Sequence, residues 1–187
     1  MAKYGALHPV FAVITSDNTD GSNPSYGEKA ILGELVKVTE TPTLNEAKQY
    51  GDNRTTEYVA EFKETTLEVE STDLSDEQMA MLYGATASEE GGVAYGGDDA
   101  APYGGFGFVS CKIKNGVKAY TGIFYPKCKA VMQATDYATK GDAITLANDK
   151  IKFLAVQPFG VKTWKDTKTF AKESEAIAWV DSQLGNT

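Results

Sequence analysis

The chain has 187 residues, of which 42% are hydrophobic and 24% charged, and its formal net charge at pH 7 is −8. This composition is typical of a globular domain and excludes a disordered chain. The acidic balance argues against sequence-specific nucleic-acid binding, which needs a basic surface. The length suits one domain covering residues 1–187.

The first predicted strand is "HPVFAVIT", His8–Thr15. Its apolar run is too short for the core of a signal peptide or a membrane span, so we expect a chain made in the cytoplasm that does not insert into a membrane. Residues 16–27 are rich in Asp, Asn, Gly and Pro and predict a flexible loop. A second strand is expected at Ile31–Val38, followed by a polar, irregular loop over residues 41–54.

A long strand is predicted at Thr55–Ser71, where apolar residues occupy one parity up to Phe62 and the other parity from Leu67. A bulge near Glu64–Thr66 would bring both sets to one face, because an inserted residue reverses the alternation of side chains. The same stretch is acidic: residues 57–70 carry five glutamates and one lysine.

A short helix follows in "LSDEQMAMLYG". Ser75 and Gln78 have the spacing of a capping box, Leu74 and Met79 that of a hydrophobic staple, and Gly84 can end the helix.

The glycine-rich stretch "GGVAYGGDDAAPYGGFGF" covers residues 91–108. It does not predict a phosphate-binding loop, because a strand hairpin follows it and a helix N-terminus would be needed. We expect a flexible surface loop at about residues 85–104. Asn115-Gly116 then predicts a two-residue hairpin turn that places Cys111 opposite Tyr120.

Five lysines and no acidic residue lie between residues 112 and 129. Pro126 is expected to break the hairpin before two further strands, residues 127–134 and 150–156, and the chain is expected to end in a helix over residues 169–185. The two cysteines have no metal or redox spacing and are expected to be buried free thiols.

The chain has one histidine, His8, and no combination of acid, base and nucleophile that could be assigned without arbitrary choice. We therefore expect no enzymatic activity, no cofactor and no metal site. The predicted fold is mainly β (α+β): a β-sandwich or curved, barrel-like sheet with a short flanking helix and a C-terminal helix. Its long strands with two partly apolar faces predict self-assembly, since exposed edges and apolar faces favour association.

Three segments carry a resemblance that spans nearly the whole chain in order: "KYGALHPVFAVIT" with "YGEKAILGELVKV", "FYPKCKAVMQATDYATKGDAITLANDKIKF", and "KTFAKESEAIAWVDSQLG". Together they resemble the major tail proteins of long-tailed bacteriophages of the phi13-like type. The resemblance implies a virion protein that forms hexameric rings, stacked into a tail tube through which double-stranded DNA leaves. Partners would be further copies of the chain and other tail proteins, such as the tape measure and the tail terminator.

From the resemblance we expect residues 55–71 and 117–134 to include strands that line the tube. The N-terminal segment, residues 41–54 and the C-terminal segment are expected to make ring or stacking contacts. Carboxylates facing the channel would repel phosphates and keep DNA from sticking. The residues expected to contribute lumen or inter-subunit charge are Glu57, Glu61, Glu68, Glu70, Lys112, Lys118, Lys127 and Lys129.

Two other functions stay open. A tube from a contractile tail-like particle or secretion system would share this architecture. A carbohydrate-binding β-sandwich module would need an aromatic platform, for which the sequence offers Tyr95, Tyr103, Tyr120, Trp164 and Trp179.

Overall fold

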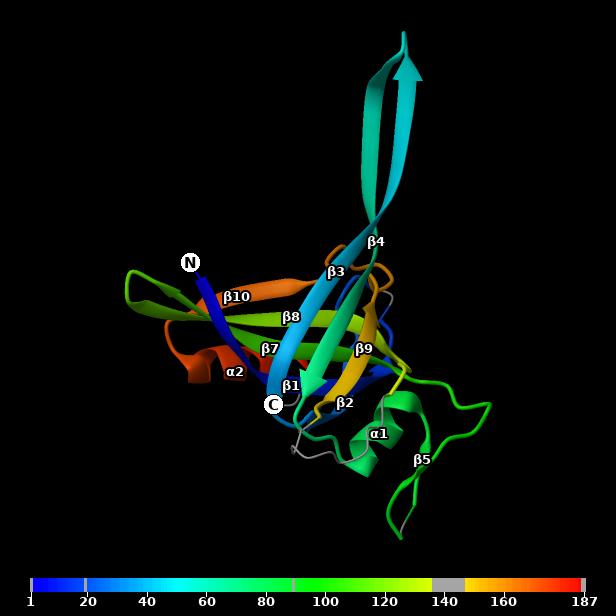
Figure 1. Cartoon of the computed structure of the whole chain (residues 1–187), viewed down its shortest axis with the longest axis vertical. Coiled ribbons are helices and arrows are strands. Elements are labelled where there is room, and N and C mark those ends of the chain that lie inside the picture. The colour runs from blue at the N-terminus through cyan, green and yellow to red at the C-terminus, as the bar shows by residue number, and fades with distance from the viewer. Residues whose placement is uncertain (1, 19, 89, 136–146, 186–187) are drawn as a thin grey trace, which may run out of the picture.

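The computed structural model describes residues 2–18, 20–88, 90–135 and 147–185 (Figure 1). These residues form one eight-stranded antiparallel sheet, a small two-stranded ribbon and two helices. The sheet contains β1 (Ala2–Ser16), β2 (Ser25–Ile31), β3 (Leu35–Gly51), β4 (Arg54–Ser71), β7 (Tyr103–Lys114), β8 (Val117–Val131), β9 (Asp149–Ala155) and β10 (Asp166–Phe170). The ribbon is β5 (Thr86–Ala87) with β6 (Val93–Ala94), and the helices are α1 (Asp76–Tyr83) and α2 (Glu173–Gln183).

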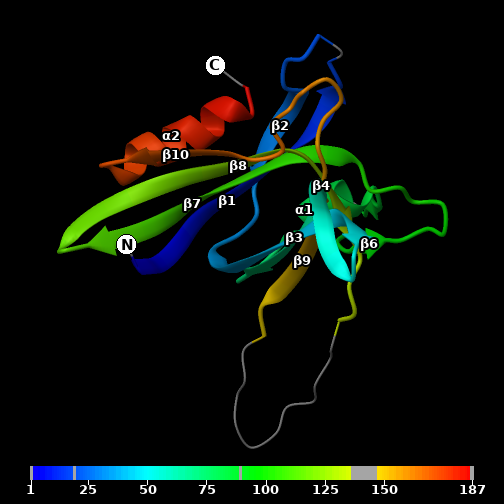
Figure 2. The same cartoon turned by 90° about the horizontal axis from the view of Figure 1, so that it is seen from above.

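The sheet is folded over into a sandwich-like, mainly β structure. Its strand order is β2-β1-β7-β8-β9-β4-β3, and β10 pairs with β8. Strand β8 joins the two halves: it pairs with β7 as far as Lys129 and with β10 over Tyr120–Phe124, and its last residues, Cys128–Val131, pair with β9. Figure 2 shows three layers: β3, β4 and β9 on one side, β1, β7 and β8 in the middle, and α2 on the other side.

Both faces of the middle layer are buried within the chain. Phe11, Phe106 and Tyr125 belong to the core shared with β4 and β9. Their strand neighbours Val10 and Phe124 belong to a second core, which is formed with α2. This arrangement confirms that both faces of these strands are apolar, but it shows that the subunit itself covers them.

The end of the glycine-rich stretch is part of β7, which begins at Tyr103 and so includes the last two residues of the expected loop. A Cβ at Gly107 would lie 2.5 Å from Cγ1 of Val180, and one at Gly105 would lie 2.7 Å from Cδ2 of Leu184. On β8, a Cβ at Gly122 would lie 2.4 Å from the Trp179 ring. These glycines are therefore needed for the close approach of α2 to the sheet.

The predicted loop over residues 41–54 is wrong, because these residues continue β3 and enter β4. The two strands pair from Leu35↔Ser71 to Gly51↔Arg54, and the turn residues Asp52 and Asn53 have φ of +49° and +61°. Within the described chain, β4 pairs with β9 only from Thr65 onward, so the outer part of the hairpin has no third strand. It projects alone from the body (Figure 1), and we call residues 44–61 the arm.

The predicted bulge in β4 is present at Lys63, one residue before the expected range Glu64–Thr66. Thr43 pairs with Glu64 and the next residue, Leu44, pairs with Phe62, so Lys63 is the extra residue. The bulge places Phe62 on the core side with Leu67, and its ring stacks on Trp164 with centroids 4.2 Å apart.

The local signals at α1 and at the β7–β8 turn are confirmed. The Ser75 side chain accepts from the Gln78 N–H, the Gln78 side chain accepts from the Ser75 N–H, and Gly84 ends the helix with φ +68°. Asn115 and Gly116 have φ of +52° and +79°, as a type I′ turn requires, and Cys111 pairs with Tyr120.

Other boundaries differ from the prediction. Gly33, with φ +62°, separates β2 from β3 within the expected strand Ile31–Val38. Pro126 does not end β8, because it lies at a register shift between β7 and β8, where a missing N–H is tolerated.

The C-terminal helix begins at Glu173, since residues 166–170 pair with β8 as β10. The loop expected at 16–27 is shorter, as β1 reaches Ser16 and β2 begins at Ser25.

Gly107→Ala should destabilise the subunit by about 1–3 kcal/mol, because the added methyl group would force α2 away from the sheet. Gly97→Ala is the matched control, since nothing lies within 4 Å of a Cβ at that position. Urea unfolding followed by tryptophan fluorescence measures both variants. Equal midpoints for the two variants would show that the helix–sheet contact is not tight.

Candidate functional site

An acidic stripe runs along one face of β4. Because Lys63 is an extra residue, the alternation reverses there, and the glutamates on both sides of the bulge share the face turned away from the core. The register with β3 shows this, since these glutamates all pair with odd-numbered β3 residues, from Lys37 to Gln49. The stripe consists of Glu57, Glu61, Glu64, Glu68 and Glu70.

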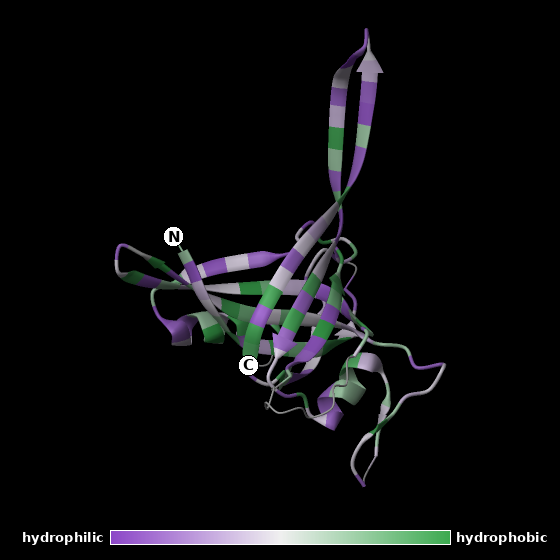
Figure 3. Cartoon of the chain, in the orientation of Figure 1, coloured by the Kyte–Doolittle hydropathy of each residue, from purple (hydrophilic) through white to green (hydrophobic). Residues whose placement is uncertain are grey.

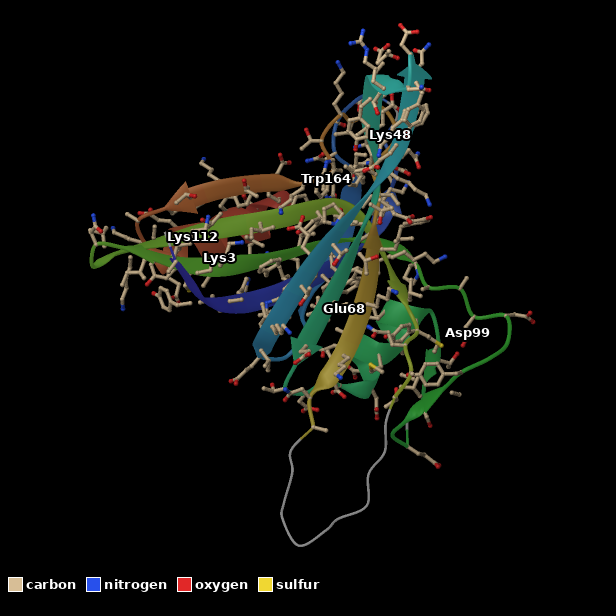
Figure 4. The ribbon with its side chains drawn as sticks, turned by 45° about the horizontal axis from the view of Figure 1, so that its top comes forward. Lys3, Lys48, Glu68, Asp99, Lys112 and Trp164 are labelled. Atoms are coloured by element: carbon tan, nitrogen blue, oxygen red, sulfur yellow. The ribbon has the colours of Figure 1, made fainter. Side chains whose placement is uncertain are left out.

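The two halves of the stripe differ in their neighbours. On the body, Glu68 lies opposite Lys152 of β9, and Glu70 lies between Lys37 of β3 and Lys150 of β9. On the arm, Glu57 and Glu61 lie opposite the uncharged Gln49 and Asn45. The stripe is therefore balanced by lysines on the body and carries excess negative charge on the arm. The labelled Glu68 in Figure 4 marks the body half.

The other face of the arm carries exposed apolar and aromatic residues. Leu44 of β3 is 47% exposed and Tyr58 of β4 is 50% exposed. The two strands pair through their backbones, and no other described strand pairs with this part of the hairpin. A hydrogen bond with Glu46 raises the pKa of Tyr58, and Lys48 Nζ lies 5.6 Å from the centre of the Tyr58 ring. Figure 3 shows hydrophobic and hydrophilic residues mixed along the arm.

The four predicted lysines fall at two distant places. Lys112 and Lys118 flank the tip of the β7–β8 hairpin, beyond the body. Lys127 and Lys129 lie at the other end of β8, with Nζ atoms 4.9 and 5.4 Å from the centre of the Tyr103 ring, and Lys127 also forms an ion pair with Asp17. The lysines therefore do not pair with the acidic stripe within one subunit.

Strand β8, which was expected to help line a channel, has no open face in its middle part. Ile123 and Tyr125 are buried against the second half of the sheet, and Phe124 is buried against α2. The outer face of β3, β4 and β9 is the polar face of the sandwich, and it carries the stripe.

The aromatic residues considered for sugar binding do not form one platform. Trp164 stacks on Phe62. Trp179 belongs to α2 and packs against Phe170 and against the backbone of β8 at Gly122. Tyr95 lies beside Tyr83 near α1, and Tyr103 lies beneath two lysines on β8. These residues belong to separate parts of the surface and core.

Side chains with catalytic potential in the described part of the chain include one histidine and two cysteines. His8 Nε2 lies 3.0 Å from an Asp181 carboxylate oxygen, which links a distorted part of β1 to α2. Both cysteines are buried free thiols, as predicted, and burial raises the pKa of each. In the described ranges no group of three or more His, Cys, Asp or Glu side chains could hold a metal ion. None of the helices described is both long and apolar enough to cross a membrane.

Comparison with protein-family models found no match to this chain, and a search of curated proteins found no significant similarity. The functional argument therefore depends on the site itself: an acidic sheet face that continues onto a projecting arm with exposed apolar residues.

Glu68→Lys should lower the free energy of unfolding by about 0.5–1 kcal/mol, because it places two lysines directly opposite each other on β4 and β9. Combining it with Lys152→Glu should restore most of the loss. Glu61→Lys, opposite Asn45, is the matched control and should change stability little. Urea titration of the four proteins measures this. If Glu68→Lys and Glu61→Lys are equally stable, the proposed charge balance on the body is wrong.

Proposed function

We propose that this chain is the subunit of a bacteriophage tail tube, which assembles into stacked hexameric rings that conduct double-stranded DNA. The sequence resemblance to major tail proteins of long-tailed phages motivates the proposal, and the mainly β, sandwich-like fold is compatible with it. The chain acts in this proposal as a structural protein of the virion tail, with no catalytic step.

The observation that carries the proposal is the arm. A two-stranded ribbon is marginally stable in water by itself, and this one exposes Leu44, Tyr50, Tyr58 and Val59 by 47–69%. Large exposed apolar groups on a projecting element are typical of a surface that binds another protein. A neighbouring ring, contacted along the long axis of the subunit, supplies such a surface.

The acidic stripe supports the second part of the proposal, which is DNA passage. A channel wall has to be polar and must not bind phosphates, because lysines without a partner would hold DNA through release of counterions. On the outer face of β3, β4 and β9, Lys37, Lys150 and Lys152 each lie opposite a glutamate. In the proposed ring this face lines the channel.

A tube from a contractile particle or secretion system would use the same subunit architecture. A contractile tube is distinguished from the tube of a long, non-contractile tail by a sheath, which binds its outside. Electron microscopy of native particles shows whether a sheath surrounds the tube.

Deleting the outer arm should abolish stacking and leave the subunit folded. Replacing residues 46–60 with Asn-Gly joins Asn45 to Glu61, which already pair, through a favoured hairpin turn. The free energy of unfolding should change by no more than about 1 kcal/mol, because in the described structure this part of the arm pairs only with itself.

Electron microscopy and light scattering of concentrated protein provide the readout. Wild-type protein should form tubes, and the shortened variant should stop at single rings or free subunits. The double substitution Glu57→Gln and Glu61→Gln, which keeps the arm, should still form tubes. Wild-type protein that stays monomeric at high concentration, even with its natural initiator of tail assembly, would contradict the proposed function.

A further inference from the structure

We infer that the tip of the β7–β8 hairpin of one copy docks into a groove beside α1 of the next copy, so that identical subunits join head to tail. The inference rests on the proposed function for the presence of further copies. Beyond the proposed function, it identifies the two surfaces through which neighbouring subunits contact each other.

The hairpin tip is basic with an apolar residue at its apex. Val117 follows the Asn115-Gly116 turn and is 69% exposed. Lys112 and Lys118 lie on the two strands beside it, and Lys3 of β1 pairs in register with Lys112. Tyr4, the next residue of β1, is 52% exposed. The tip therefore presents apolar and positively charged groups together, and no acidic residue lies between residues 112 and 129.

The groove has an apolar wall that could accommodate the apex of the hairpin. It lies where β4 ends and α1 begins, has a volume of about 590 Å³, and its apolar wall includes Leu74, Met79, Tyr83 and Met132. Methionine side chains adapt to the shape of an inserted group, which suits a docking site for a protein segment. The size is within the range of pockets that bind ligands.

Polar groups of the groove also fit a basic hairpin tip. Asp149 lies at its wall, where its carboxylate also accepts a hydrogen bond from the Leu74 N–H. Glu70 and Lys150 line the groove too and lie opposite each other on β4 and β9. Gln133 lines it as well, and the Gln133 Nε2 atom is buried without a hydrogen-bond partner among the residues described. A backbone carbonyl at the inserted turn would give this donor an acceptor.

The charge around the groove completes the match. The described residues 73–88 and 90–99, which contain α1, β5 and β6, carry six acidic residues and no lysine or arginine. Figure 4 shows Lys3 and Lys112 on one side of the subunit and Asp99 on the opposite side. Charge complementarity between these sides favours a head-to-tail contact and disfavours contacts between two tips or two grooves.

Such a contact is heterologous, because two different surfaces of the same chain meet. A heterologous contact repeats from subunit to subunit and closes into a ring when the rotation between neighbours allows it. The β7–β8 turn and α1, which lines the groove, lie on opposite sides of the body, so the tip cannot reach the groove within a single copy (Figure 1).

Cysteine cross-linking tests the contact directly. Copies carrying Val117→Cys are mixed with copies carrying Met132→Cys at concentrations that permit assembly, and the mixture is oxidised. The two introduced thiols should form a disulfide between copies, at least about tenfold more than the pair Leu44→Cys with Met132→Cys, because docking raises their effective concentration. Wild-type protein should not cross-link, since Cys111 is 6% and Cys128 0% exposed.

The outcomes separate this inference from the proposed function. Absence of the mixed disulfide overturns the inference, as does cross-linking of Leu44→Cys to Met132→Cys, which would place the arm in the groove. Val117→Cys copies that link only to each other overturn it too. Electron microscopy of the same sample reports tubes independently: tubes without the mixed disulfide retain the proposed function, and the mixed disulfide without tubes retains this contact alone.

Charge reversal at the tip tests the electrostatic part of the same contact. Adding Lys112→Glu and Lys118→Glu to the Val117→Cys copies should lower the yield of the mixed disulfide about tenfold and remove its dependence on salt. Lys162→Glu, at an exposed lysine between β9 and β10, is the control and should leave the yield unchanged. An unchanged yield in the tip variant would remove the basis for charge-guided docking.

Discussion

The subunit depends on burial of both faces of its middle layer, β1, β7 and β8. One face packs on the second half of the sheet, and the other packs on α2 at a distance that only glycine at positions 105, 107 and 122 permits. The glycine-rich stretch is thus explained in part by packing. Because the chain covers these faces itself, contacts with other copies would use other surfaces, and the arm and the hairpin tip both expose large apolar side chains.

Signals encoded within a few residues were predictable from the sequence. The Ser75–Gln78 capping box and the Asn115-Gly116 turn each depend on local hydrogen bonding or backbone conformation. The bulge in β4 was also predictable, since a change in parity between Phe62 and Leu67 can be satisfied on one face only by an extra residue.

Features that depend on distant segments were not predictable. Residues 41–54 look like a loop because both faces of the arm are exposed, so no core imposes an alternation of apolar residues. Pro126 is accepted in β8 only because of a register shift opposite β7. The lysines opposite Glu68 and Glu70 come from β3 and β9, and the groove beside α1 is built from β4, α1 and the ends of β8 and β9. The spacing of residues along the sequence does not show which of these distant segments become neighbours in the fold.

A tube requires two kinds of contact in different directions, one around each ring and one between rings. The arm projects along the longest axis of the subunit, whereas the basic tip and the acidic end lie on opposite sides of the body (Figure 1, Figure 4). In the proposed assembly the arm therefore acts between rings and the tip acts within a ring. Separate elements for the two contacts allow rings to form first and stack afterwards, because each contact has its own residues and its own dependence on charge.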